Sequence, residues 1–149
     1  MNTEEHIYKV DLNWIEARKG LLQIDDQTAT VEVATPPPFN GGLEGYWSPE
    51  HLLTASVSSC FMTTFLAIAE NSKLQFTSFS CSAKGILEQV EGKWLMTEIQ
   101  LFPKVDLADE NDREKAVRVF TKSEAACLIS NSIKMKVSLH HSTRIENVG

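Results

Sequence analysis

The sequence lacks the features that mark several common classes of protein. Basic residues are outnumbered, 14 against 20 acidic ones, and no basic run interrupts the formal charge of −6, which argues against nucleic acid as a partner. The first residues contain no apolar signal segment, so we expect a cytoplasmic protein. The three cysteines form no CxxC or HxxxC spacing, so the sequence predicts no metal site, and we expect no cofactor.

Features that would divide the chain are missing too. The 149 residues contain no repeat, low-complexity tract or linker, so we expect a single domain over residues 1–149. One uncharged stretch, residues 52–69, is at the lower length limit for a membrane span, but it contains six hydroxyl residues. We interpret it as a buried central helix and expect no membrane association.

The remaining pattern is one of strands and two helices. Three prolines from Pro36 and the glycine-rich segment 39–47 predict a loop. Helices are predicted from Ser48 to about Asn71 and from Asn111 to about Ile129. This order of elements indicates an α+β fold, because strands and helices do not alternate regularly. The predicted strands are 7–14, 21–24, 28–34, 74–88, 94–103 and 133–142.

The first predicted helix has a clear start and an unusual composition. Ser48, Pro49 and Glu50 suit its N-cap, first position and first turn. Its apolar residues occupy nearly every face, and a helix of this kind is buried on all sides. A domain of 149 residues has difficulty surrounding such a helix alone, which hints at a dimer.

Composition and periodicity leave the cysteines as ordinary core residues. Cys60 lies in the first predicted helix, Cys127 at the end of the second, and Cys81 in a strand. A buried cysteine is more often a small hydrophobic residue than a reactive one. His140 and His141 are neighbours on a predicted strand, so they point to opposite faces, and we interpret both as surface residues.

Three segments around these residues form a recognisable set. Gly41-Gly42, the run from Ser48 to Leu53, and Ala55 to Cys60-Phe61 make up the first. Glu124 to Asn131 is the second, and Glu16 to Gly20 is the third. In this order they resemble the OsmC/Ohr family, which has a Pro-Glu-x-Leu helix start, a central Cys-Phe, a second motif that usually reads Cys-Pro-x-Ser, and, in the Ohr branch, a Gly-Gly-Arg-x-Gly turn.

The resemblance implies a fold, an activity and a set of site residues. The fold is OsmC-like α+β, with antiparallel sheets around two central helices in an intertwined dimer. The activity is that of a peroxidase acting on organic hydroperoxides in oxidative-stress defence. Cys60 would be the peroxidatic thiol and Cys127 the resolving thiol, and Glu50 would orient an arginine. Arg18 is the candidate, as in the Ohr branch, because the OsmC branch takes its arginine from a stretch where residues 35–45 here contain none.

The implied chemistry suits these residue types. An ordinary thiol is only about 3% thiolate at pH 7. A nearby guanidinium increases that fraction and burial decreases it, so we expect Arg18 to outweigh burial at Cys60. The thiolate attacks the peroxide, an alcohol leaves, and the resulting sulfenic acid condenses with Cys127 to a redox-active disulfide. An external dithiol, which the resemblance suggests is a lipoyl group, then restores both thiols.

Helix geometry adds a constraint to the implied site. Glu50 and Cys60 are ten residues apart, which is about 15 Å along a straight helix. They cannot share one site within a chain, so we expect an obligate homodimer in which one chain supplies both cysteines and its partner supplies Arg18 and Glu50. Apolar residues beside the motifs are candidates for a substrate pocket, with core packing as the alternative for each: Phe39, Tyr46, Trp47, Phe61 and Met62.

Two other functions stay open on the same fold. A non-enzymatic ligand-binding stress protein would keep the cysteines as structural residues, and a thiol-based redox sensor would form the disulfide but turn over slowly.

Three positions depart from the family pattern. Ser48 stands where asparagine is common, Leu128 stands where proline follows the second cysteine, and Glu16-Ala17 replaces the glycines before Arg18.

Overall fold

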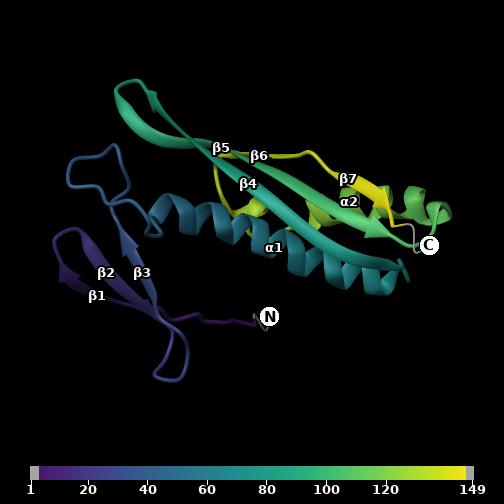
Figure 1. Cartoon of the computed structure of the whole chain (residues 1–149), viewed down its shortest axis with the longest axis horizontal. Helices are drawn as coiled ribbons and strands as arrows, with labels where there is room; N and C mark the ends of the chain where they lie inside the picture. The colour runs from purple at the N-terminus through teal and green to yellow at the C-terminus, as the bar shows by residue number, and fades with distance from the viewer. Residues whose placement is uncertain (1–3, 147–149) are drawn as a thin grey trace. The chain divides into compact units, whose positions relative to one another are not determined.

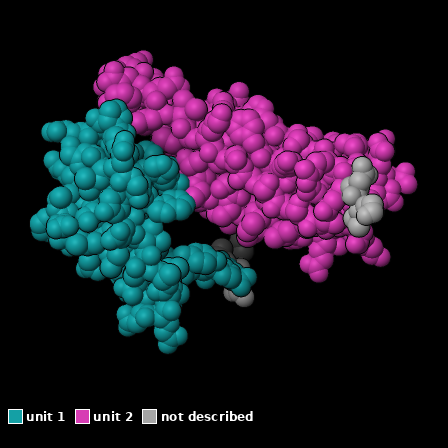
Figure 2. All heavy atoms as spheres, in the orientation of Figure 1, with its two compact units in different colours: residues 1–52 teal, residues 53–149 magenta. Residues whose placement is uncertain are grey.

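The computed structural model describes residues 4–146 and divides into two compact units, residues 1–52 and 53–149 (Figure 2). The long helix α1 (Pro49–Asn71) begins in the first unit and continues in the second. The order of strands and helices confirms the predicted α+β fold (Figure 1). The expectation of a single domain stays a prediction.

The first unit contains a three-stranded antiparallel sheet in the order β1-β2-β3. Its strands are β1 (Asp11–Glu16), β2 (Lys19–Gln23) and β3 (Val31–Ala34). Ala17 and Arg18 form the two-residue turn between β1 and β2, and the Trp14 indole N–H donates to the Ala17 carbonyl at 3.0 Å. The first strand begins later than residue 7, and every residue of β1 is exposed.

The second unit contains a long hairpin of β4 (Phe76–Val90) and β5 (Lys93–Leu107). Glu91 and Gly92 make its turn with positive φ angles of 52° and 79°, as a tight hairpin requires. Two short strands, β6 (Lys136–Leu139) and β7 (Ser142–Ile145), pair parallel to β5 one after the other. The sheet is therefore mixed rather than purely antiparallel.

The start of α1 is fixed by a reciprocal cap. The Ser48 hydroxyl accepts the His51 backbone N–H at 3.2 Å, and His51 Nδ1 accepts the Ser48 backbone N–H at the same distance. Two N–H groups that the first turn leaves unpaired are thereby satisfied. The predicted start at Ser48 is one residue early, because Ser48 is the cap and not the first helical residue.

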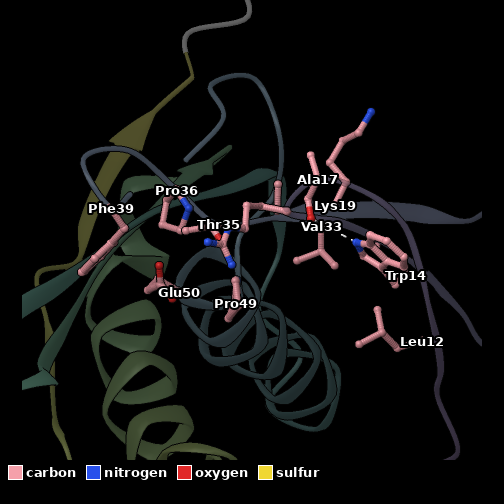
Figure 3. A pocket seen from close by; sticks show the side chains of 13 residues that line it. Leu12, Trp14, Ala17, Lys19, Val33, Thr35, Pro36, Phe39, Pro49 and Glu50 are labelled. Atoms are coloured by element: carbon pink, nitrogen blue, oxygen red, sulfur yellow. Dashed lines mark hydrogen bonds between the residues drawn. The ribbon is translucent and has the colours of Figure 1, made fainter. Parts of the chain in front are cut away.

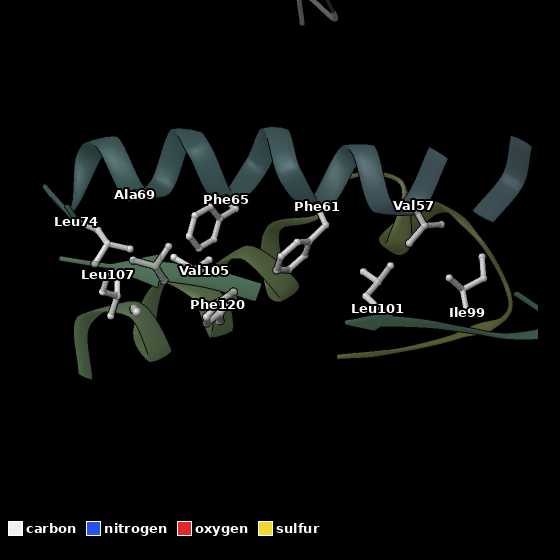
Figure 4. Packing of buried hydrophobic residues seen from close by; sticks show 12 residues of the cluster. Val57, Phe61, Phe65, Ala69, Leu74, Ile99, Leu101, Val105, Leu107 and Phe120 are labelled. Carbon is white, nitrogen blue, oxygen red and sulfur yellow. The ribbon is translucent and has the colours of Figure 1, made fainter. Parts of the chain in front are cut away.

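Within the chain, α1 buries one stripe and not every face. Val57, Phe61, Phe65 and Ala69 recur every four residues and pack against Phe120 and the apolar side of β5 (Figure 4). Met62 and Leu66, on another face, are 38% and 40% exposed. The helix is long and apolar enough to cross a membrane by length and composition alone. Its stripe is instead part of the core of the second unit.

The second predicted helix and the last predicted strand are both shorter than expected. Helix α2 (Arg113–Ala126) follows a 3-10 turn, η1 (Glu110–Asp112), and it ends before Cys127, whose backbone is extended. A second 3-10 turn, η2 (Ser130–Ser132), follows. The predicted strand 133–142 is two strands, because the ladder to β5 is interrupted between Leu139 and Ser142.

Candidate active site

Cys60 and Cys127 lie close together in the second unit. Cys60 projects from α1, Cys127 directly follows α2, and the nearby Cys127 thiol is one of the groups that lower the pKa of Cys60. The Ile129 backbone N–H also donates to Cys60 Sγ at 3.5 Å, and the Ser130 hydroxyl donates to Cys127 Sγ at 3.2 Å. Both thiols are free, with Cys127 buried and Cys60 partly exposed. The structure thus brings the predicted cysteine pair together and leaves Cys60 the more accessible of the two.

Uncharged hydrogen-bond donors shift the acidity of Cys60. Burial raises the pKa of its thiol, but hydrogen bonds from the Ile129 N–H, the Cys127 thiol, the Thr64 hydroxyl and the Leu128 N–H together bring the pKa below its ordinary value. Sequence reasoning looked for a cation and missed these donors. The signal that could have indicated the Ile129 donor is the helix break at Ser130-Asn131, because N–H groups at the start of the new turn that follows a break have no intrahelical partner.

Cys81 differs chemically from the pair. It lies on β4, paired with Pro103 of β5, and burial raises the pKa of its thiol. The thiolate is the reactive form of cysteine, so burial makes Cys81 less reactive at neutral pH.

Arg18 and Glu50 line one cavity of about 690 Å³ in the first unit. Arg18 comes from the β1–β2 turn, and Glu50 comes from the first turn of α1. Glu50 and Phe39 lie toward one end of this cavity, and Leu12 and Trp14 toward the other (Figure 3). The predicted arginine and carboxylate therefore line one cavity. The orienting role of Glu50 stays a prediction.

Three backbone features place the Arg18 side chain. Ala17 has a φ of +48°, so the turn takes the left-handed conformation that glycine favours, although the family's glycine is absent here. The Thr35 N–H donates to the Arg18 carbonyl at 3.3 Å. Gly41 has a φ of +80°, and a β-carbon there would lie 2.8 Å from Arg18 Nε. The guanidinium thus packs on the bare backbone of the glycine-rich loop.

The five residues predicted to line a substrate pocket lie in different surroundings. Phe39 lines the cavity of Arg18 and Glu50. Tyr46 and Trp47 line a second cavity in the first unit, of about 460 Å³, which contains neither of these two residues. Phe61 is 1% exposed in the core of the second unit, which fits the core-packing alternative, and Met62 is exposed on α1.

Residues 4–146 contain no group of three or more His, Cys, Asp or Glu side chains that could hold a metal ion. The chemistry available to the described part of the chain is that of its thiols, its hydrogen-bond donors and the Arg18–Glu50 cavity.

Comparison with known proteins identifies the family. Residues 41–142 match the family described as OsmC-like protein. The uncharacterized protein YmaD of Bacillus subtilis is 25% identical over 138 residues, which are 91% of each chain. An OsmC-like protein of unknown function from Vibrio cholerae superposes with a TM-score of 0.81 at 21% identity, covering 93% of this chain and 100% of the other. An organic hydroperoxide resistance protein from Elizabethkingia anophelis, with thiocyanate bound, gives 0.73 at 21% identity, covering 96% and 100%.

The family match spans most of the chain, so this protein belongs to the OsmC-like family. The predicted resemblance to the OsmC/Ohr proteins is thereby confirmed. The solved structures confirm the α+β fold over nearly the whole chain.

Proposed function

We propose that this protein is a cysteine-based peroxidase that reduces organic hydroperoxides to alcohols in oxidative-stress defence. The observation that carries the proposal is that Cys60 on α1 and Cys127 directly after α2 are two free thiols brought close together, with the Ile129 N–H donating to Cys60 Sγ and the pKa of Cys60 lowered despite burial. The E. anophelis neighbour, named an organic hydroperoxide resistance protein, supports the same substrate class. We place the protein in the cytoplasm, where thiols stay reduced between turnovers.

The redox steps of the proposed cycle take place on two thiols and an external dithiol. The Cys60 thiolate attacks one peroxide oxygen, the O–O bond breaks, and the alkoxide leaves as an alcohol after taking a proton. Cys60 is then a sulfenic acid. The Cys127 thiol attacks its sulfur, water leaves, and a Cys60–Cys127 disulfide forms. A dithiol such as a lipoyl group reduces this disulfide and becomes oxidised itself.

In this proposal Arg18 and Glu50 act on the cysteines of a second copy of the chain. Glu50 lies about 15 Å from Cys60 along α1 by helical rise, too far for one site. The Arg18–Glu50 cavity would receive the alkyl part of the substrate against Phe39 and Trp14, with the guanidinium facing the peroxide. The exposed apolar residues of α1 and β1 support burial against such a copy.

A peroxide-consumption assay with an alkyl hydroperoxide and a dithiol tests the activity. We expect Cys60→Ser to abolish turnover and Cys81→Ser to change it little. In Cys127→Ser, the sulfenic acid should persist or overoxidise, which mass spectrometry detects as added oxygen. Equal rates in all three variants would favour a ligand-binding protein. A wild-type disulfide that forms without sustained turnover would favour a redox sensor.

A further inference from the structure

The first turn of α1 is closed by a histidine, where a capping box usually has glutamate or glutamine. Ser48 is the cap, and His51 is the third helical residue. The His51 backbone N–H donates to the Ser48 hydroxyl, and the Ser48 backbone N–H donates to His51 Nδ1, both at 3.2 Å. The Ser48 hydroxyl lies 2.7 Å from the same ring nitrogen. His51 occupies the variable position of the Pro-Glu-x-Leu helix start, so the motif alone does not supply this imidazole.

The cap geometry requires a neutral imidazole at His51. A backbone N–H can only donate, so Nδ1 presents a lone pair to Ser48 and the ring proton is on Nε2. An imidazolium has an N–H on both nitrogens and cannot accept this bond. Ser48 is only 1% exposed, so the loss of this acceptor would be costly. A positive charge on the ring would also lie at a helix N-terminus, where a cation is unfavourable.

The cap encloses two residues of the cavity that Arg18 lines. Pro49 and Glu50 lie between Ser48 and His51 in the chain, and both line that cavity (Figure 3). If the Ser48–His51 bonds open, the first turn of α1 loses the contacts that close it. That turn carries Glu50, so the state of the His51 ring bears directly on the position of the carboxylate.

The surroundings of His51 leave it open to solvent protons. Its side chain is exposed, and its ring meets the uncharged Trp47 ring at 76° with the centroids 6.4 Å apart. Trp47 is held to β3, because the Ala34 N–H donates to its carbonyl at 2.8 Å. Substitution of His51 keeps every other charged or titratable side chain on β3, on the loop before α1, on the first turn and on the β1–β2 turn. These side chains are Glu32, Glu44, Tyr46, Glu50 and Arg18.

We propose that His51 is a positioning residue that makes the first turn of α1, and with it Glu50, respond to pH. Neutral His51 keeps the cap closed. As pH falls through the range in which histidines take up a proton, from about pH 8 to pH 5, the imidazolium releases the Ser48 N–H and the turn opens. The bond is thus present at high pH and lost at low pH. Its effect on turnover rests on the proposed peroxidase function, in which Glu50 orients Arg18.

Peroxide turnover of wild type and His51→Gln, measured at about pH 7.5 and about pH 5.5, tests the positioning role. Glutamine accepts the Ser48 N–H at both pH values, as in an ordinary capping box, whereas alanine in His51→Ala accepts it at neither. Cys60 titrates in every variant, so the ratio of rates isolates position 51. We expect wild type to match His51→Gln at the higher pH and to fall to about a tenth of it at the lower pH, where it should match His51→Ala.

Hydrogen exchange of the Ser48 amide, followed by NMR, tests the cap without peroxide. We expect equal exchange rates in wild type and His51→Gln at about pH 7.5. At about pH 5.5, exchange in wild type should be about tenfold faster than in His51→Gln, the order expected for one lost hydrogen bond. His140→Gln, at a histidine of the second unit, is the control and should keep the wild-type pH dependence of both turnover and exchange.

The two measurements separate this inference from the proposed function. Equal Ser48 exchange in wild type and His51→Gln at both pH values overturns the inference, and so does a ratio of turnover that stays constant between them. The comparison of wild type with His51→Gln decides the matter even if His51→Ala does not fold. Absence of peroxide turnover in the wild type, with the expected exchange pattern intact, counts against the peroxidase function alone.

Discussion

Gly41 gives the Arg18 side chain the space that it occupies. A β-carbon at position 41 would lie 2.8 Å from Arg18 Nε, and one at Gly45 would meet nothing within 4 Å. Both glycines have positive φ, +80° and +84°, so alanine adds a similar backbone strain at either position. Differences between the two variants therefore report the displacement of Arg18.

We expect Gly41→Ala to lower peroxide turnover by about tenfold or more, because a small misplacement of a catalytic group is costly. Gly45→Ala should lose a comparable free energy of unfolding, about 1 kcal/mol, and keep its turnover. The measurements are steady-state peroxide consumption and urea denaturation of both variants. If Gly41→Ala and Gly45→Ala consume peroxide at equal rates, then either Arg18 takes no part in the reaction or its side chain tolerates the displacement.

Ser130 donates to Cys127, so it should act on the second chemical step more than on the first. A hydroxyl donor stabilises negative charge on the Cys127 sulfur as it attacks the Cys60 sulfenic acid. We expect Ser130→Ala to slow disulfide formation about tenfold after one equivalent of peroxide. The control is Ser132→Ala, whose hydroxyl donates to the Leu128 carbonyl at 2.8 Å. Quenched-flow trapping of the sulfenic acid measures the rate, and identical trapping lifetimes would contradict this role.

The residues of the site were predictable from sequence to different degrees. Cys60 and Cys127 stand inside recognisable motifs, so their pairing across 67 residues could be expected from those motifs alone. The donation from the Ile129 N–H to Cys60 could not, because the direction of a backbone N–H depends on φ and ψ and not on the side chain. Phe61 also stands in a motif, yet its place in the core depends on which face of α1 meets Phe120.

At the scale of elements, the buried Asp106 carboxylate links β7 to the hairpin of β4 and β5. Asp106 on β5 accepts Arg144 Nε at 3.1 Å and Arg144 Nη2 at 2.8 Å from β7. The Ser78 hydroxyl on β4 donates to the same carboxylate at 2.8 Å. Arg144 and Ser78 hold the pKa of Asp106 below its ordinary value. One side chain thus joins three strands of the second unit.

This arrangement predicts how stability depends on pH. A carboxylate with a lowered pKa in the folded state contributes stability above its unfolded pKa of about 3.9, and the contribution is lost as pH falls through the lower folded value. We expect Asp106→Asn to destabilise the protein at pH 7 and to remove part of the decline in stability below about pH 4. Urea denaturation between pH 2 and 7 measures this. Glu110→Gln, at an exposed carboxylate, is the control, and parallel pH profiles for wild type and Asp106→Asn would exclude the contribution.

The sequence indicates which segments form helices and which form strands better than it indicates where each of them begins and ends. The start of α1 followed from Ser48 and Pro49, because capping is a local property of the chain. The split between β6 and β7 did not, since Ile133 to Ser142 alternates without interruption. The split lies between the Leu101–Leu139 pair and the Lys104–Ser142 pair, so its position depends on the pairing with β5. Parallel pairing to β5 is likewise a tertiary property.

At the scale of the whole molecule, each unit leaves apolar side chains in contact with solvent. Leu12 and Trp14 on β1 are 62% and 76% exposed, and Met62 and Leu66 add apolar surface on α1. Exposed apolar side chains that gather on one element are candidates for a protein interface. The sequence had indicated a helix buried on all sides, and one chain buries a single stripe of it. A second copy of the chain is the cover that we propose, and it is also the source of Arg18 and Glu50.

Mixing two inactive variants tests the composite site. Cys60→Ser lacks the attacking thiol and Arg18→Met lacks the guanidinium, so neither homodimer should turn over peroxide. In a heterodimer with composite sites, the Arg18→Met chain supplies Cys60 and the Cys60→Ser chain supplies Arg18, which completes one site and leaves the other with neither group. Random pairing of equal amounts makes half of the dimers mixed, each with one working site of two, so co-expressed chains should recover about a quarter of wild-type turnover. A heterodimer isolated through two different affinity tags should reach about half. Sites built within one chain would leave both preparations inactive, because every Cys60 would then stand beside the substituted arginine of its own chain.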